Sequence, residues 1–143
     1  MEWIDKFVIG IFDIVESTDI YVILDYLDID ITYLPGDSIL LCNSEAFYSR
    51  NINNRETIFI RHDLPKPYEK FVLAHELGHA ILHTRVFEAA YRGFMSEGKL
   101  ENEANYFAIK LLDIELDPVY YDGFTKEALA SALYIHEDAA QFL

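Results

Sequence analysis

The feature that most constrains this chain is the His-Glu-x-x-His motif at residues 75–79, which stands inside the apolar run 71–83. In a helix this spacing puts His75 and His79 one turn apart on the same face, so their imidazoles can reach one metal ion. Glu76 follows the first histidine and can take a proton from a water molecule at the open position of that metal. The motif therefore predicts a metal site, with zinc as the expected ion, in a layout typical of a zinc-dependent hydrolase.

The neighbours of the motif favour a metal over a purely structural role. Most of the surrounding residues are apolar, so the predicted helix is buried: they are Phe71, Val72, Leu73, Ala74, Leu77, Ala80, Ile81 and Leu82. The alternative interpretation is a buried helix whose histidines bond only to the backbone. Burying two histidines and a glutamate without partners costs several kcal/mol. One metal ion with one water molecule satisfies all three side chains.

Length and composition predict a single globular domain over residues 1–143, since 52% of the residues are hydrophobic and 25% are charged. The formal net charge is −14, from 25 acidic and 11 basic residues. This balance argues against direct binding to nucleic acids or to anionic membranes. It would attract a basic macromolecular partner, and it also has the simpler use of keeping a protein soluble.

Cysteine usage and the N-terminal residues predict a soluble, cytoplasmic protein. Cys42 is the single cysteine, so no internal disulfide can form, and we expect its thiol to be buried as an apolar group. The apolar run 7–12 lacks the basic region and the cleavage site of a signal peptide. Acidic residues from Asp13 onward end this run well before the roughly 20 residues that span a bilayer.

Hydrophobic periodicity predicts an α+β fold, in which a small, mostly antiparallel sheet packs with helices and one helix carries the motif. The His-Glu-x-x-His motif on that helix makes the expected fold zincin-like. Gly78 costs a helix up to about 1 kcal/mol, so we expect another backbone to approach closely there. The residues 83–99 are expected to form a helical turn and a loop. We expect five helices: one over 3–15, a short one that follows a cap at 17–19 and ends at 27, the motif helix from Pro67 to 82, one over 100–112, and one over 126–134 capped by Thr125. A segment 137–143 follows the last helix. Strands are expected over 29–33, 39–42, 46–48 and 57–61.

Two histidines leave a catalytic zinc site one protein ligand short, and the best source of the third is the predicted helix 100–112. On a helical wheel Glu103 lies about 90° to one side of the apolar stripe and Glu101 about 70° to the other. Periodicity does not choose between them. Either glutamate alone is also compatible with a solvated position at the edge of the stripe.

The segment Phe-Val-Leu-Ala-His-Glu-Leu-Gly-His-Ala-Ile-Leu-His at 71–83, followed by Glu-Asn-Glu-Ala-Asn-Tyr-Phe-Ala at 101–108, resembles the ImmA/IrrE metallopeptidase family. The resemblance covers these two motif helices closely and the rest of the chain loosely. It implies that the glutamate directly before Ala-Asn, Glu103, is the third zinc ligand. In that family a proline often follows the second helix at once, whereas here Pro118 comes later.

The remaining histidines are expected to play lesser parts. His83 lies two turns after His75, and Cα atoms at that spacing are about 12 Å apart, so it is expected to support the metal ligands or the packing rather than to bind the metal. His62 and His136 are expected at the surface. One of these two, or a tyrosine such as Tyr106, could stabilise the oxyanion of the reaction, and the sequence leaves this choice open.

Together these features predict a zinc-dependent endopeptidase in which His75, His79 and Glu103 hold the metal and Glu76 is the general base. The resemblance implies that it acts on a helix-turn-helix repressor of a phage or mobile element and relieves repression. The alternative is an antirepressor that binds and sequesters this repressor without cleaving it. A structural zinc site is disfavoured because such sites are rich in cysteine, and direct DNA binding is disfavoured by the acidic charge.

Overall fold

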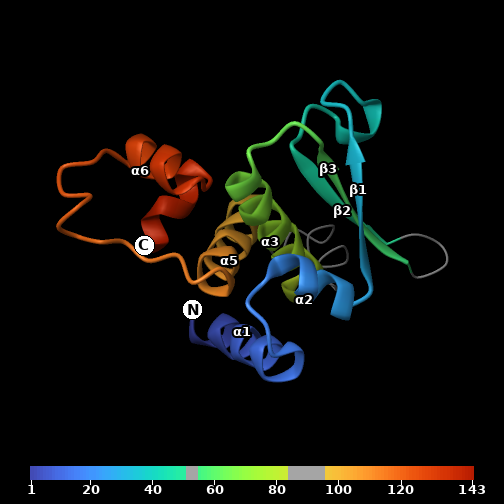
Figure 1. The fold of residues 1–143 in the computed structure, drawn as a ribbon, viewed down its shortest axis with the longest axis horizontal. Coiled ribbons are helices and arrows are strands. Elements are labelled where there is room, and N and C mark those ends of the chain that lie inside the picture. The colour runs from blue at the N-terminus through green and yellow to red at the C-terminus, as the bar shows by residue number, and fades with distance from the viewer. Residues whose placement is uncertain (51–54, 84–95) are drawn as a thin grey trace.

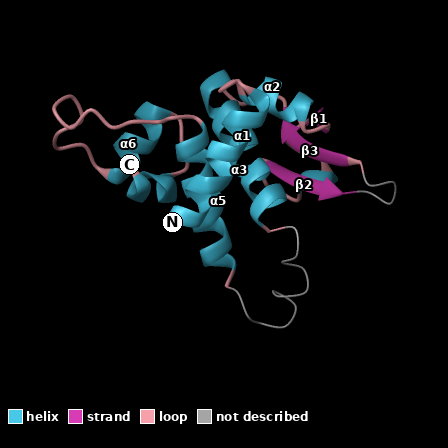
Figure 2. Cartoon of the chain, turned by 90° about the horizontal axis from the view of Figure 1, so that it is seen from below, coloured by secondary structure: helices cyan, strands magenta, loops and turns pink. Residues whose placement is uncertain are grey.

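The computed structural model describes residues 1–50, 55–83 and 96–143 and has an α+β fold, as predicted. Figure 1 shows the sheet on one side of the helix α3 and the C-terminal elements on its other side. Figure 2 shows the same arrangement from below. In chain order the elements are α1 (Glu2–Val15), α2 (Ile20–Tyr26), β1 (Ile29–Leu34), the 3-10 helix η1 (Ile39–Leu41), β2 (Ala46–Arg50), β3 (Glu56–Arg61), α3 (Lys66–Leu82), α5 (Glu97–Leu111), α6 (Lys126–Leu133) and the 3-10 helix η2 (Glu137–Phe142).

The sheet is mixed rather than mostly antiparallel, which corrects the expectation from sequence. Its strand order is β1-β3-β2, with β1 parallel to β3 and β2 antiparallel to β3. After β1 the chain passes to the far edge and forms β2, and β3 then returns between the two strands. Ile58 in the middle of β3 therefore faces Ile31 on one side and Tyr48 on the other. Periodicity predicts the three segments that form these strands, but it contains no information on their order in the sheet.

The expected strand at 39–42 is instead the 3-10 helix η1. The Ser38 hydroxyl accepts a hydrogen bond from the Leu40 amide at 3.3 Å, and Cys42 ends the turn in the left-handed conformation with φ of 50°. Cys42 is exposed rather than buried, which also corrects the expectation. A short apolar run does not distinguish a strand from a helical turn, and here Ser38 caps the turn and decides the outcome.

The helices largely follow their predicted starts and stops. Asp19 caps α2 by accepting from the Tyr21 amide at 2.9 Å, and Thr125 caps α6 by accepting from the Ala128 amide at 3.1 Å. Pro67 lies in the first turn of α3, where its missing N–H costs nothing. The expected turn and loop at 83–99 fall mostly outside the described residues. In the described ranges, none of the helices is at once long enough and apolar enough to cross a bilayer.

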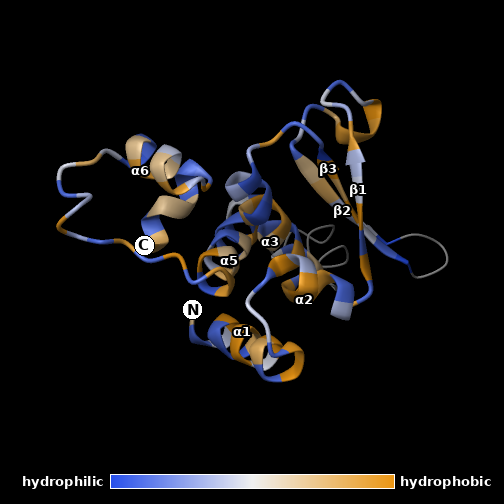
Figure 3. Ribbon diagram, in the orientation of Figure 1, coloured by the Kyte–Doolittle hydropathy of each residue, from blue (hydrophilic) through white to orange (hydrophobic). Residues whose placement is uncertain are grey.

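Helix α3 is the centre of the fold, and apolar residues are frequent on it and on α2 (Figure 3). Gly78 lets α5 approach, as predicted, because a Cβ at this position would lie 3.2 Å from the Cα of Ala104 and 3.1 Å from Cδ1 of Phe107. On another face, the buried Glu69 accepts hydrogen bonds from the hydroxyls of Tyr21 and Tyr33. These contacts fix α3 against α5, α2 and β1 and so determine where the motif residues lie.

Candidate metal centre

Helices α3 and α5 bring three side chains together in a group that can hold a metal ion: His75, His79 and Glu101. The Nε2 atoms of the two histidines are 3.1 Å apart. Glu101 Oε2 lies 3.1 Å from His75 Nε2, and Glu101 Oε1 lies 3.0 Å from His79 Nε2. All these ligand atoms lie within 4.8 Å of one another.

The donor set fits a catalytic zinc ion. Two imidazoles and one carboxylate are a ligand set that leaves a fourth position open for water or substrate. Bonds of about 2.0–2.1 Å in a tetrahedron place donor atoms about 3.4 Å apart, close to the separations of 3.0–3.1 Å among these atoms. His75 is buried with 4% of its side chain exposed, whereas Glu101 is 48% exposed, so one side of the group faces solvent.

The third member of this group is Glu101, whereas the family resemblance points to Glu103. Glu103 Oε2 lies 2.9 Å from His83 Nε2 instead, and its side chain is buried. Residues 101 and 103 are about 200° apart around a helix, so they cannot both face the same two histidines. Periodicity left both glutamates open, and the way α5 packs on α3 turns Glu101 toward the motif.

His75 is oriented by Asn105, a residue that the sequence analysis did not single out. Asn105 Oδ1 lies 2.8 Å from His75 Nδ1, so Nδ1–H donates to it and leaves the Nε2 lone pair for a metal. Asn105 is one helical turn after Glu101 and therefore shares its face of α5. This four-residue spacing is the signal that could have identified both residues together.

His79 is oriented through a second chain of contacts. His83 Nδ1 lies 3.0 Å from His79 Nδ1, and His83 Nε2 donates to Glu103 Oε2. When His79 Nε2 keeps its lone pair for a metal, its Nδ1–H donates to His83, and the proton on His83 then belongs to Nε2. Within the described ranges, His83 is outside the candidate metal-binding trio of His75, His79 and Glu101, and it contacts His79, a member of that trio.

Hydrogen bonds, burial and neighbouring charges shift the pKa values of three residues in the site: Glu101, Glu76 and His79. Hydrogen bonds from His75 and His79 hold the pKa of Glu101 well below its usual range. Burial raises the pKa of Glu76, against the opposing influence of the two neighbouring histidines. Burial alone would lower the pKa of His79, but its hydrogen bond to Glu101 and the charges of Glu76 and Glu101 outweigh burial and raise it.

His136 lies beside the trio rather than at the surface, which corrects the expectation. Its ring centroid is 4.8 Å from that of His75, and its Nδ1 lies 3.2 Å from Asn105 Oδ1. Its Nε2 lies 3.3 Å from Oε2 of Glu45. Of the other residues considered for the oxyanion, His62 is exposed, and the Tyr106 hydroxyl donates to Asp5 of α1 at 2.9 Å.

Two comparisons connect this geometry with known proteins. The model of a peptidase family, the IrrE N-terminal-like domain, matches residues 24–141. The Metallopeptidase ImmA of Bacillus subtilis (strain 168) is 39% identical over 70 residues, and this match covers 45% of the chain. The chain matches 41% of the length of that relative.

Proposed function

The chain belongs to the ImmA/IrrE metallopeptidase family, and from this premise we propose that it is a zinc-dependent endopeptidase with a zincin-like active site. One observation carries the proposal: His75, His79 and Glu101 lie together in a group that can hold a metal ion, and Glu76 follows His75 on α3. This donor set leaves a position open, which distinguishes a hydrolytic site from a structural one.

Each residue of the constellation has a part in peptide hydrolysis. His75, His79 and Glu101 would hold the zinc ion. When bound, zinc supplies a Lewis acid that polarises the scissile carbonyl and makes water more acidic. Glu76 takes the proton from the attacking water and passes it to the leaving amine.

Glu103, by this proposal, supports the site without touching the metal. It fixes His83, and His83 fixes His79. Substitution of Glu103 should therefore weaken zinc binding less than substitution of Glu101. Asn105 has the corresponding part for His75. Residues that hold a metal ligand in place without binding the metal themselves typically contribute about 10- to 100-fold to metal affinity.

The proposed substrate is a helix-turn-helix repressor of a phage or mobile element, whose cleavage relieves repression. The resemblance of the two motif helices to the ImmA/IrrE family implies this substrate class, and the net charge of −14 suits a basic DNA-binding surface. The same charge would equally attract a repressor that is sequestered without being cleaved, so the test must separate the two outcomes.

The test uses zinc-loaded wild-type protein and the variant Glu76→Gln, each with measured zinc content. Both are incubated with a purified helix-turn-helix repressor from the same genome, and fragments are identified by mass spectrometry. We expect cleavage by the wild type alone, abolished by a chelator. An intact repressor in a stable complex with both proteins would mean an antirepressor that acts by binding, and the proposed catalysis would be wrong.

A further inference from the structure

A pocket of about 550 Å³ lies beside the metal centre, between the start of α3, the start of β2 and the segment that follows α6. Its apolar surface includes Tyr68, Tyr134 and Ile135. Its acidic groups are Glu45 and Glu137, and none of the described residues that line it is a lysine or arginine. The pocket therefore combines an aromatic wall with negative charge.

The pocket adjoins the metal-binding trio through His136, which lines the pocket and also packs against the ring of His75. Tyr68 precedes His75 by seven residues, so both lie on one face of α3, about 10 Å apart along the helix axis. An extended peptide advances about 3.3 Å per residue. When the scissile peptide bond lies at the trio, a substrate side chain up to three residues from that bond can therefore reach the pocket.

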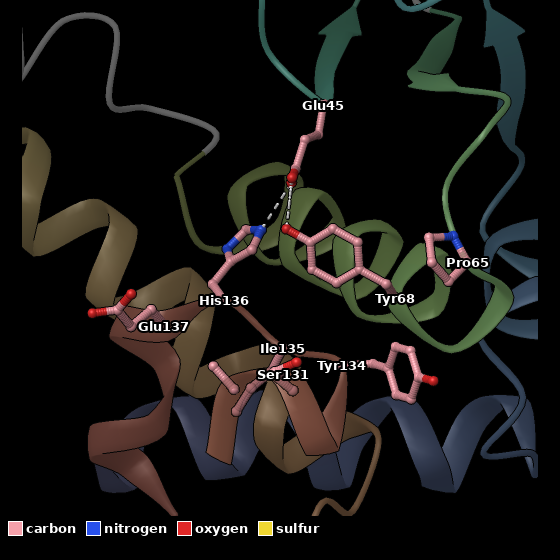
Figure 4. A pocket seen from close by; sticks show the side chains of 9 residues that line it. Glu45, Pro65, Tyr68, Ser131, Tyr134, Ile135, His136 and Glu137 are labelled. Atoms are coloured by element: carbon pink, nitrogen blue, oxygen red, sulfur yellow. Dashed lines mark hydrogen bonds and ion pairs between the residues drawn. The ribbon is translucent and has the colours of Figure 1, made fainter. Parts of the chain in front are cut away.

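Glu45 is the polar centre of the pocket (Figure 4). The Tyr68 hydroxyl lies 2.7 Å from both carboxylate oxygens of Glu45, and His136 reaches one of them from the other side. The hydrogen bond to His136 holds the pKa of Glu45 below its usual value, so the carboxylate is ionised at neutral pH. Its side chain is still 39% exposed, which leaves it accessible to a ligand.

We propose that this pocket binds an arginine side chain of the peptide substrate, within three residues of the scissile bond. This inference rests on the proposed peptidase function and adds the substrate class to it. The aliphatic stem packs on Tyr68 and Ile135, and the guanidinium reaches Glu45, where carboxylate and aromatic ring both favour it. Glu137 adds negative charge at the margin of the pocket.

The test compares pairs of short peptides that are identical except for arginine or citrulline at one position, which is moved along the peptide. Citrulline has nearly the same shape without the charge. With zinc-loaded protein, we expect arginine to raise kcat/KM about three- to tenfold over citrulline at one position near the cleaved bond. The Glu45→Gln variant should bring this ratio close to one.

Matched variants separate charge from shape. Glu45→Asp keeps the charge and should keep a preference for arginine, and Tyr68→Phe removes only the hydroxyl next to Glu45 and should keep it too. Glu2→Gln changes the net charge equally at an exposed position on α1 and should leave the ratio unchanged. Melting temperature and zinc content are measured for every variant, so that a loss of structure is recognised.

The outcomes distinguish this inference from the proposed function. Cleavage with equal rates for arginine and citrulline, or a ratio unchanged in Glu45→Gln, would refute the arginine pocket while the peptidase stands. If no peptide is cleaved, fluorescence anisotropy with the Glu76→Gln protein measures the dissociation constants of the same labelled pairs. A preference for arginine that depends on Glu45 would then support the pocket without the peptidase, and equal affinities would overturn it.

Discussion

Adding one methyl group at Gly78 should loosen the contact between α3 and α5 on which the metal centre depends. In the variant Gly78→Ala, the new Cβ would lie 3.1 Å from Cδ1 of Phe107, 3.2 Å from the Cα of Ala104 and 3.4 Å from its carbonyl oxygen. Two of these three atoms belong to the backbone of the buried residue Ala104, so relief requires α5 to move away from α3. The same movement carries Glu101 away from His75 and His79.

The magnitude follows from two opposing terms. Alanine stabilises a helix interior by about 1 kcal/mol relative to glycine. Overpacking a well-packed contact costs about 1–3 kcal/mol. Gly10→Ala on α1 is the matched control, because a Cβ there meets nothing within 4 Å and only the favourable term applies. We therefore expect Gly78→Ala to be less stable than Gly10→Ala by about 1–3 kcal/mol.

Thermal unfolding of the metal-free variants, followed by circular dichroism, measures this difference. For a domain of this size, 1 kcal/mol corresponds to roughly 3 °C, so the two variants should melt about 3–9 °C apart. Zinc affinity, measured by chelator competition, should fall roughly tenfold in Gly78→Ala and stay constant in Gly10→Ala. If Gly78→Ala raises the melting temperature as much as Gly10→Ala does, the close approach of the two helices is refuted.

Four further substitutions test the site and its support. Glu101→Gln should weaken zinc binding more than Glu103→Gln, and the reverse order in chelator competition would assign the third ligand to Glu103. Asn105→Ala should lower zinc affinity about 10- to 100-fold, and an unchanged affinity would exclude it as the residue that orients the ring of His75. Glu69→Leu removes the buried carboxylate that accepts hydrogen bonds from the hydroxyls of Tyr21 and Tyr33 and should cost about 1–3 kcal/mol in urea unfolding, against an effect near zero if these bonds contribute nothing. The pKa of the Glu101 carboxyl is depressed in the folded metal-free protein. The ionised carboxylate therefore stabilises the fold above the usual carboxyl pKa, and this stability is lost as the pH falls through the folded pKa. Glu101→Gln should flatten this loss of stability at acid pH, and an unaltered profile of stability against pH would contradict the prediction.

Local sequence patterns were sufficient to predict most of the helices and the chemistry of the motif. Interactions within a few residues decide where a helix starts and which face it buries. The cap at Thr125, a cap within 17–19 and the apolar surroundings of the motif could therefore be predicted directly. The one-turn spacing of His75 and His79 is likewise a local property of α3. The need for a close backbone neighbour at Gly78 followed from the cost of glycine in a helix, although the neighbour itself did not.

Contacts between distant segments decided the rest. The strand order β1-β3-β2 depends on which edge the chain reaches after β1, and no residue pattern within a strand records this. The choice between Glu101 and Glu103 depends on the rotation of α5 against α3, which is set by packing around Ala104. His136 joins the metal centre only because the segment after α6 returns to α3. The sequence by itself determined the chemistry of the motif helix, and the tertiary structure decided its partners, because side chains far apart in the chain meet only where whole helices pack.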